Sequence, residues 1–143
     1  MSQFPTEMRV PATLASLQTL LEFVTSCAER RGVGQARIRE IELVMEELLV
    51  NIFNYAYPER PGDVEVACRL DNTGGLVVEI ADEGIPFNTL NQKDPDREAG
   101  IDERTVGGLG IFFVKRLIRD IRYRREGGRD ILTLTVDPAP APP

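Results

Sequence analysis

Residues 64–81 read VEVACRLDNTGGLVVEIA, two apolar stretches on either side of a turn-forming segment. The first stretch, 64–70, alternates apolar and polar side chains, which is the period of a strand with one buried face. The second stretch, 75–81, is almost continuously apolar and includes the β-branched residues Val77, Val78 and Ile80. Because DNTGG between them is rich in turn formers, the sequence predicts a β-hairpin here.

The segments around this hairpin carry helix and strand signals of their own. Apolar side chains recur at helical spacing over 13–31 and again over 35–57, where Pro58 ends the pattern. We expect a short strand at 6–10, a helix at 111–119 and a second hairpin that pairs 120–125 with 130–136. The order is therefore strand, two helices, two strands, long loop, helix, two strands.

Strands grouped in hairpins, with helices before and between them, are typical of the α+β class. We therefore expect a two-layer α/β sandwich, in which a mostly antiparallel, mixed sheet is covered on one face by helices. Residues 1–136 are expected to form one domain. The Pro/Ala-rich residues 137–143 lack the apolar side chains needed for packing, and we expect them to be a disordered tail.

Composition excludes several classes of function. The 143 residues include 17 basic and 23 acidic side chains, a formal net charge of −6, which argues against direct nucleic-acid binding. Histidine is absent, which excludes Ser-His-Asp catalysis, His-ligated zinc and phosphohistidine on this chain. Cys27 and Cys68 are expected to be buried reduced thiols of a cytoplasmic protein. Neither a signal peptide nor a membrane helix is evident, so no membrane association is expected.

The helix predicted over 35–57 has a polar face. Glu47, Asn51 and Asn54 lie together on it at helical spacing, opposite an apolar stripe centred on Met45 and Ile52. On the helical wheel alone, a solvated face is the simpler explanation. Asparagine is unfavourable inside a helix, however, because its amide competes for backbone hydrogen bonds. The three side chains therefore also suit a surface that presents oxygen ligands.

Two glycine-containing segments follow buried stretches. Asp82-Glu83-Gly84 comes directly after a predicted strand, so the carboxylate could accept a hydrogen bond while a ligand approaches the backbone; a plain turn is the alternative. The segment GGLG at 107–110 leads into a predicted helix, whose N-terminal amides suit a phosphate; a hinge is the alternative. It is neither a Walker A loop nor a convincing Rossmann fingerprint.

In this order and spacing, the segments 47–51, 82–84 and 108–110 resemble the N, G1 and G2 boxes of the GHKL superfamily of ATPases and kinases. The resemblance covers residues 6–136. The sequences NIFNYAY (51–57) and GGLGI (107–111) are most similar to the anti-sigma-factor serine/threonine kinases, the RsbW-like group. The resemblance implies a sandwich of the Bergerat type, with ATP and Mg²⁺ as cofactors.

The resemblance also implies a role for each matching residue. Asn51 would be a Mg²⁺ ligand and Glu47 would accept the proton of a substrate hydroxyl. Asp82 would bind the adenine amino group, and Gly84 would allow close backbone approach. The acidic loop 88–104 would be the ATP lid. Nucleotide contacts are further implied for Asn54 and for the lid-end residues Gly107, Gly108, Leu109 and Gly110.

The chain departs from the family pattern at three places. Pro86 stands where a second glycine is usual, and Tyr55 stands where a histidine is common. The Gly-Thr pair usual before the last strand is absent, with Thr133 the nearest candidate, so that adenine contact stays open. Arg104 is a further candidate for a phosphate contact.

The activity implied by the resemblance is that of an anti-sigma-factor kinase in a partner-switching system that regulates transcription. It would bind a sigma factor or another regulator and phosphorylate a serine or threonine of an antagonist, an anti-anti-sigma protein of the STAS type. A homodimer is also favoured. The alternatives are an ATP-binding regulatory module without kinase activity and a domain of the same shape that no longer binds nucleotide.

A basic cluster near the C-terminal end is a separate feature. A solvated face is the favoured interpretation, and docking of an acidic partner is the alternative. Its members are Lys115, Arg116, Arg119, Arg122, Arg124, Arg125 and Arg129.

Overall fold

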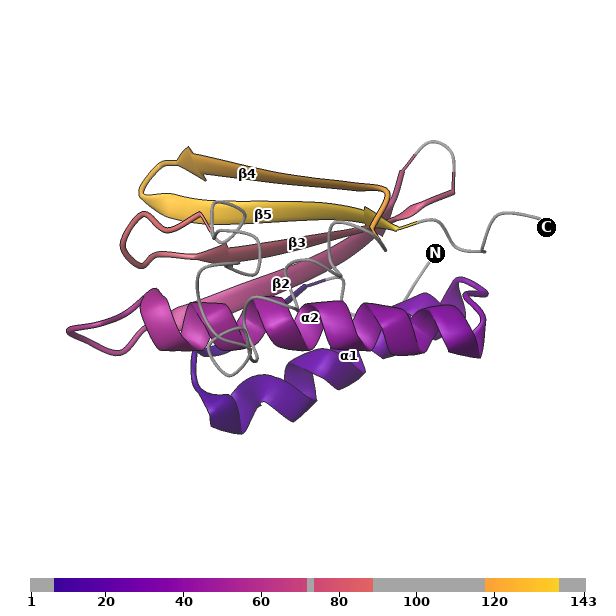
Figure 1. The fold of residues 1–143 in the computed structure, drawn as a ribbon, viewed down its shortest axis with the longest axis horizontal. Coiled ribbons are helices and arrows are strands. Elements are labelled where there is room, and N and C mark those ends of the chain that lie inside the picture. Colours follow the sequence, from indigo (N-terminus) through magenta and orange to yellow (C-terminus); the bar gives the residue numbers. More distant parts are fainter. Residues whose placement is uncertain (1–6, 72–73, 89–117, 137–143) are drawn as a thin grey trace, which may run out of the picture.

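The computed structural model describes residues 7–71, 74–88 and 118–136 (Figure 1). The described elements follow the predicted order. They are β1 (Glu7–Pro11), a 3₁₀ turn (Leu14–Ser16), α1 (Leu17–Arg30), α2 (Gln35–Tyr55), β2 (Asp63–Leu70), β3 (Leu76–Asp82), β4 (Asp120–Glu126) and β5 (Arg129–Val136). Of the helix predicted over 111–119, residues 111–117 lie outside the described residues, and residues 118–119 are not helical.

The strands form one sheet in the order β1-β2-β3-β5-β4, and every ladder among these described strands is antiparallel. Both predicted hairpins are confirmed. In the first, Val64 pairs with Asp82 and Leu70 with Leu76. In the second, β4 and β5 are joined through Gly127 and Gly128, whose φ values are 60° and 78°. Glycine adopts positive φ without steric cost, which is what a tight two-residue hairpin turn requires.

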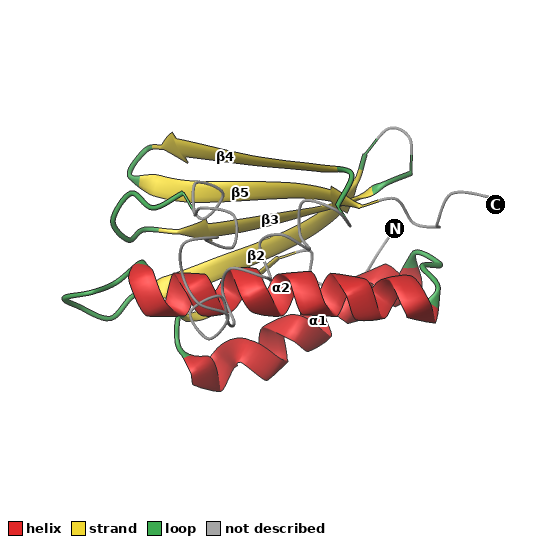
Figure 2. Ribbon diagram, in the orientation of Figure 1, coloured by secondary structure: helices red, strands yellow, loops and turns green. Residues whose placement is uncertain are grey.

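Helices α1 and α2 cover one face of the sheet, and the core lies between the two layers (Figure 2). Strand side chains alternate between faces, so β2 directs Val64, Val66 and Cys68 toward the helices. From α2, Met45 and Leu48 are at most 1% exposed, which confirms the predicted apolar stripe. Burying each such side chain contributes roughly 1.5–3 kcal/mol. The α+β sandwich expected from the sequence is therefore confirmed.

The prediction that both cysteines are buried and reduced is confirmed. Cys27 on α1 and Cys68 on β2 are both buried and unoxidised. The edge strand β4 has the sequence DIRYRRE and is largely exposed. Its three arginines are the kind of charged side chain that commonly protects an exposed strand edge from pairing.

Candidate functional site

The polar face of α2 contains a hydrogen-bonded pair. Asn51 is 4% exposed, and its side chain hydrogen-bonds the half-buried carboxylate of Glu47 one turn earlier. Burial raises the pKa of Glu47; the hydrogen bond from Asn51 opposes this effect, and the nearby charge of Glu46 adds to it. Asn54 lies on the same stretch of helix and is exposed. The interpretation of this face as fully solvated is therefore wrong for Asn51.

At the end of β3, Asp82 is a buried carboxylate, 5% exposed. Its Oδ1 accepts a hydrogen bond of 2.9 Å from the backbone N–H of Gly84. Burial raises the pKa of Asp82 to about 6, and the charge of Asp130 also raises it, while the Gly84 N–H and two arginines lower it. Asp82 is thus a carboxylate held in place at one oxygen and enclosed by protein.

Gly84 brings the segment after β3 into direct contact with the end of α2. A Cβ atom at this position would overlap the carbonyl oxygen of Ala56, so no other residue fits without a shift of the backbone. The next amide, of Ile85, donates a 2.9 Å hydrogen bond to that same oxygen. The end of α2 and the end of β3 therefore meet at Ala56. Ala56 lies five residues after Asn51, which is about 7.5 Å along the helix axis.

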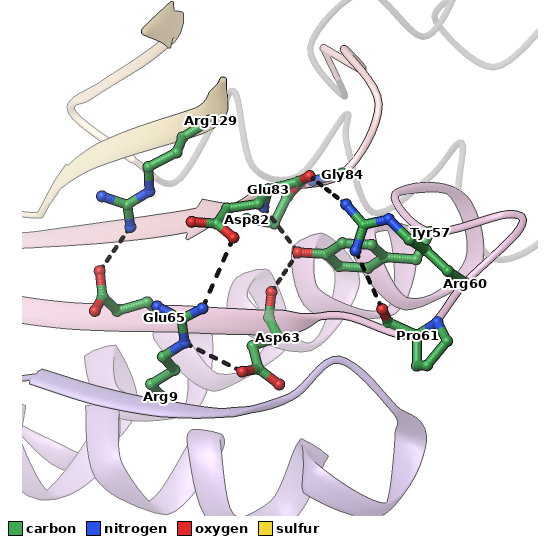
Figure 3. Close-up of polar contacts among 10 residues, drawn as sticks. All are labelled: Arg9, Tyr57, Arg60, Pro61, Asp63, Glu65, Asp82, Glu83, Gly84 and Arg129. Carbon is green, nitrogen blue, oxygen red and sulfur yellow. Dashed lines mark hydrogen bonds and ion pairs between the residues drawn. The ribbon is translucent and has the colours of Figure 1, made fainter. Parts of the chain in front are cut away.

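Tyr57 fixes the same segment from a second side, as Figure 3 shows. Its hydroxyl accepts a 2.8 Å hydrogen bond from the N–H of Glu83 and donates one of 2.6 Å to the carbonyl of Asp63. Arg60 lies over the Tyr57 ring, 5.6 Å from its centre, and donates to the carbonyl oxygen of Glu83 at 3.4 Å. This role of Tyr57 was not predicted from the sequence, although an aromatic residue directly before Pro58 was a visible signal.

Tyr55, the residue that stands where a histidine is common, contacts the far end of the same segment. Its ring lies 5.3 Å from that of Phe87, centre to centre, at an angle of 39°. Next to Gly84 there is also a cavity of about 610 Å³, walled by apolar groups of Ala56 and Ile85 and by Arg125. Gly84 lines this cavity but Glu47, Asn51 and Asp82 do not, so the cavity meets the predicted nucleotide site only at Gly84.

The residue beside Asp82 on the last strand is Asp130. The two are directly paired across β3 and β5, and Asp130 is 4% exposed. Thr133, the nearest candidate from the sequence, pairs with Glu79 on the sheet face away from the helices and accepts a 3.4 Å hydrogen bond from Arg124. Because alternate strand residues face opposite sides, Thr133 is not beside Asp82.

The described members of the basic cluster all have acidic partners within the chain, at nitrogen–oxygen distances of 2.7–3.2 Å. This arrangement favours the interpretation of a solvated, internally paired surface. The pairs are Arg119 with Asp71, Arg122 with Asp120, Arg124 with Glu126, Arg125 with Asp130, and Arg129 with Glu65. Lys115 and Arg116 lie outside the described residues.

The predicted phosphate-binding segment Gly107, Gly108, Leu109 and Gly110, together with Arg104, also lies outside the described residues. Over 7–71, 74–88 and 118–136, no group of three or more His, Cys, Asp or Glu side chains could hold a metal ion. Neither of the two described α-helices is long and apolar enough to cross a membrane.

An antiparallel sheet covered by two helices on one face, with a buried aspartate and a glycine at the end of β3, is the architecture of the GHKL class of ATP-binding domains. The chain belongs to the histidine kinase-like ATPase domain family, whose sequence model matches residues 10–136. This membership places the chain in a kinase-like family and implies that it uses ATP.

Several named proteins are similar to most of this chain. The chain is 25% identical to "Serine-protein kinase RsbW" of Bacillus thuringiensis (strain Al Hakam) over 130 residues, 88% of this chain and 81% of that protein. It is 24% identical to the protein of the same name in Bacillus anthracis (strain A0248), with the same coverage.

Solved structures show the same fold. The RsbU and RsbW domains of a Mycobacterium tuberculosis protein match with a TM-score of 0.59 and 16% identity, over 94% of this chain. The histidine kinase domain of the Erythrobacter litoralis blue-light activated histidine kinase matches with a TM-score of 0.54 and 19% identity, over 85% of this chain. The chain spans 32% of the first structure and 60% of the second.

Proposed function

We propose that this chain is a serine/threonine protein kinase of the anti-sigma-factor type, which binds Mg²⁺ and ATP and phosphorylates an antagonist protein. The observation that carries the proposal is the Glu47–Asn51 pair, a buried carboxamide bonded to a half-buried carboxylate one helical turn away. The similarity to serine-protein kinases over 88% of the chain supports the same activity.

Glu47 is the proposed base. A carboxylate transfers protons more effectively when its pKa lies closer to the working pH, and burial moves the pKa of Glu47 in that direction. In this role Glu47 accepts the proton of a serine or threonine hydroxyl as that oxygen becomes the nucleophile. Glu46 is exposed and lies about 100° around the helix, so it is the poorer candidate.

Asn51 is the proposed protein ligand of Mg²⁺. The ion prefers oxygen donors and often takes only one or two from protein, leaving phosphate oxygens and water to complete an octahedron. A carboxamide oxygen beside a carboxylate fits this preference. When bound, Mg·ATP supplies the phosphoryl group and the counter-charge for its transfer.

Asp82 and Gly84 are proposed to recognise the base. One oxygen of Asp82 is occupied by the Gly84 N–H, which leaves the other to accept a hydrogen bond from the adenine amino group. Asn54, exposed beyond Asn51 on α2, is proposed to contact the nucleotide as well. The phosphates are assigned to the backbone amides of Gly107, Gly108, Leu109 and Gly110.

The proposed biological role is partner switching in transcription regulation. The partners are a sigma factor or another regulator and an anti-anti-sigma protein of the STAS type, and the chain acts as a cytoplasmic homodimer of a single domain, residues 1–136. The similarity to serine-protein kinases named RsbW supports this assignment.

Substitution of Glu47 tests the kinase activity. Glu47→Gln keeps the size and polarity of the side chain but removes the base. We expect it to abolish phosphorylation of purified STAS-domain proteins of the source organism, measured by mass spectrometry, while ATP affinity stays within about two-fold. Glu46→Gln is the matched control and should phosphorylate normally.

Two other outcomes would change the assignment. If the wild-type chain binds Mg·ATP but phosphorylates none of these proteins, the chain is a nucleotide-dependent binding module. If Glu47→Gln phosphorylates as fast as the wild type, Glu47 is not the base.

A further inference from the structure

The β4–β5 hairpin also holds the segment 83–87, in addition to Tyr57 and the end of α2. From the end of β4, the Nη1 atom of Arg125 donates a 2.9 Å hydrogen bond to the carbonyl oxygen of Gly84. The same nitrogen donates to Oδ1 of Asp130 at 3.0 Å. One guanidinium nitrogen therefore joins the start of the segment to a buried carboxylate of the neighbouring strand.

Asp130 holds the other end of the segment. Its Oδ2 accepts a 2.9 Å hydrogen bond from the backbone N–H of Phe87, and its Oδ1 accepts a 2.6 Å hydrogen bond from the hydroxyl of Tyr123. With the bond from Arg125, this carboxylate accepts three donors, two from β4 and one from the segment after β3. Burial of a charge is tolerated only with such complete hydrogen bonding, so the arrangement is specific to a charged residue at this position.

We propose that Arg125 and Asp130 are positioning residues of the nucleotide site, which fix the segment 83–87 against the hairpin and so hold Asp82 in place for the adenine amino group. This inference rests on the proposed function. Neither residue touches Asp82 through a hydrogen bond of its own; they act through Gly84, Phe87 and their charges.

Because Arg125 and Asp130 carry opposite charges, an experiment can separate their effects on Asp82. The charged and titratable groups that act electrostatically with Asp82 are Asp130 and Arg129 on β5, Arg125 and Tyr123 on β4, and Tyr57 after α2. Of these, Asp130 is its direct partner across β3 and β5, whereas Arg129 pairs with Glu65 on the other face of the sheet. Arg125 lowers the pKa of Asp82, whereas Asp130 raises it. Only the ionised carboxylate is a full acceptor for an amino group, so nucleotide affinity should fall as the pH drops through the pKa of Asp82.

The test compares the pH midpoint of Asp82 ionisation in Arg125→Gln with that in Asp130→Asn. Loss of the arginine should move the midpoint of Asp82 upward by about one pH unit, and loss of the carboxylate should move it downward. For Arg125→Gln the ionised fraction of Asp82 would then fall about five-fold at pH 6 but only about two-fold at pH 7. A residue that merely supports the fold would lower affinity at all pH values and leave the midpoint unchanged.

Two readouts are measured between pH 5 and 8.5. In the free protein, the NMR shift of the Gly84 amide follows the ionisation of Asp82, to which it is bonded. In the complex, calorimetry gives the dissociation constant of ATP; titration of the phosphates is common to all variants and cancels in the comparison. Arg124→Gln, on the same strand but paired with Glu126, is the matched control, and Arg125→Lys should return the midpoint toward the wild-type value.

Opposite midpoint shifts in both readouts are the expected result. Unchanged midpoints, or shifts in the same direction for both substitutions, would overturn the inference. A wild-type chain that binds no ATP would instead refute the proposed function, and the Gly84 titrations in the free protein would still decide whether Arg125 and Asp130 control Asp82.

Discussion

Gly84→Ala tests the contact that joins the end of β3 to α2. The added methyl group would overlap the carbonyl oxygen of Ala56, and this oxygen belongs to backbone that cannot rotate away. The segment must therefore move outward. That movement breaks the 2.9 Å hydrogen bond from Ile85 to Ala56 and strains the bonds of Gly84 with Asp82 and Arg125.

The expected cost follows from these losses. Overpacking costs about 1–3 kcal/mol, and one lost backbone hydrogen bond adds about 1 kcal/mol. The sum, about 2–4 kcal/mol, should lower the Tm of a chain of this size by roughly 10 °C. Because Asp82 is bonded to the Gly84 N–H, ATP affinity should fall by at least about ten-fold at the same time.

The assay is differential scanning calorimetry together with ATP titration, with Gly34→Ala as control. Gly34 has open space around its Cβ direction and no positive φ, and as the N-cap of α2 its replacement should cost less than about 1 kcal/mol. If Gly84→Ala melts within about 2 °C of Gly34→Ala and binds ATP equally well, the proposed contact does not control the site.

Two further predictions concern neighbouring side chains. Burial raises the pKa of Asp82 to about 6, so ionisation of this carboxyl destabilises the fold as the pH rises from about 4 to 6. Asp82→Asn should therefore be more stable than wild type by about 2–3 kcal/mol at pH 7 but not at pH 4, as measured by urea titrations at both pH values. Equal gains at both pH values would contradict this. Tyr57→Phe leaves the Glu83 N–H and the Asp63 carbonyl without their partner and should cost about 1–3 kcal/mol; no change in the urea midpoint would exclude this anchor.

The local elements were predictable because they depend on short-range patterns. The alternation of 64–70, the glycine turn at 127–128 and the apolar stripe of α2 each fix an element without knowledge of the rest of the chain. The four-residue spacing of Glu47 and Asn51 likewise predicted that the two side chains would meet, and they are hydrogen-bonded.

The surroundings of Asp82 were not predictable, because they depend on which strands are neighbours and in which register. The sequence gives no direct sign that β5 lies beside β3, or that Asp130 rather than Thr133 faces Asp82. A shift of one residue in that register would place the opposite set of side chains on the helix-covered face. The Arg125–Asp130 interaction emerges only when both hairpins are placed in one sheet.

The central claim, a Mg·ATP site built on Asn51, is tested most directly by calorimetric titration of ATP into the wild-type chain and Asn51→Ala, with and without Mg²⁺. We predict Mg²⁺-dependent binding to the wild type that is weakened by at least ten-fold in Asn51→Ala, while the variant's Tm shows that it remains folded. Absence of binding to the wild type at millimolar ATP, or equal Mg²⁺-dependent binding to both chains, would contradict the claim.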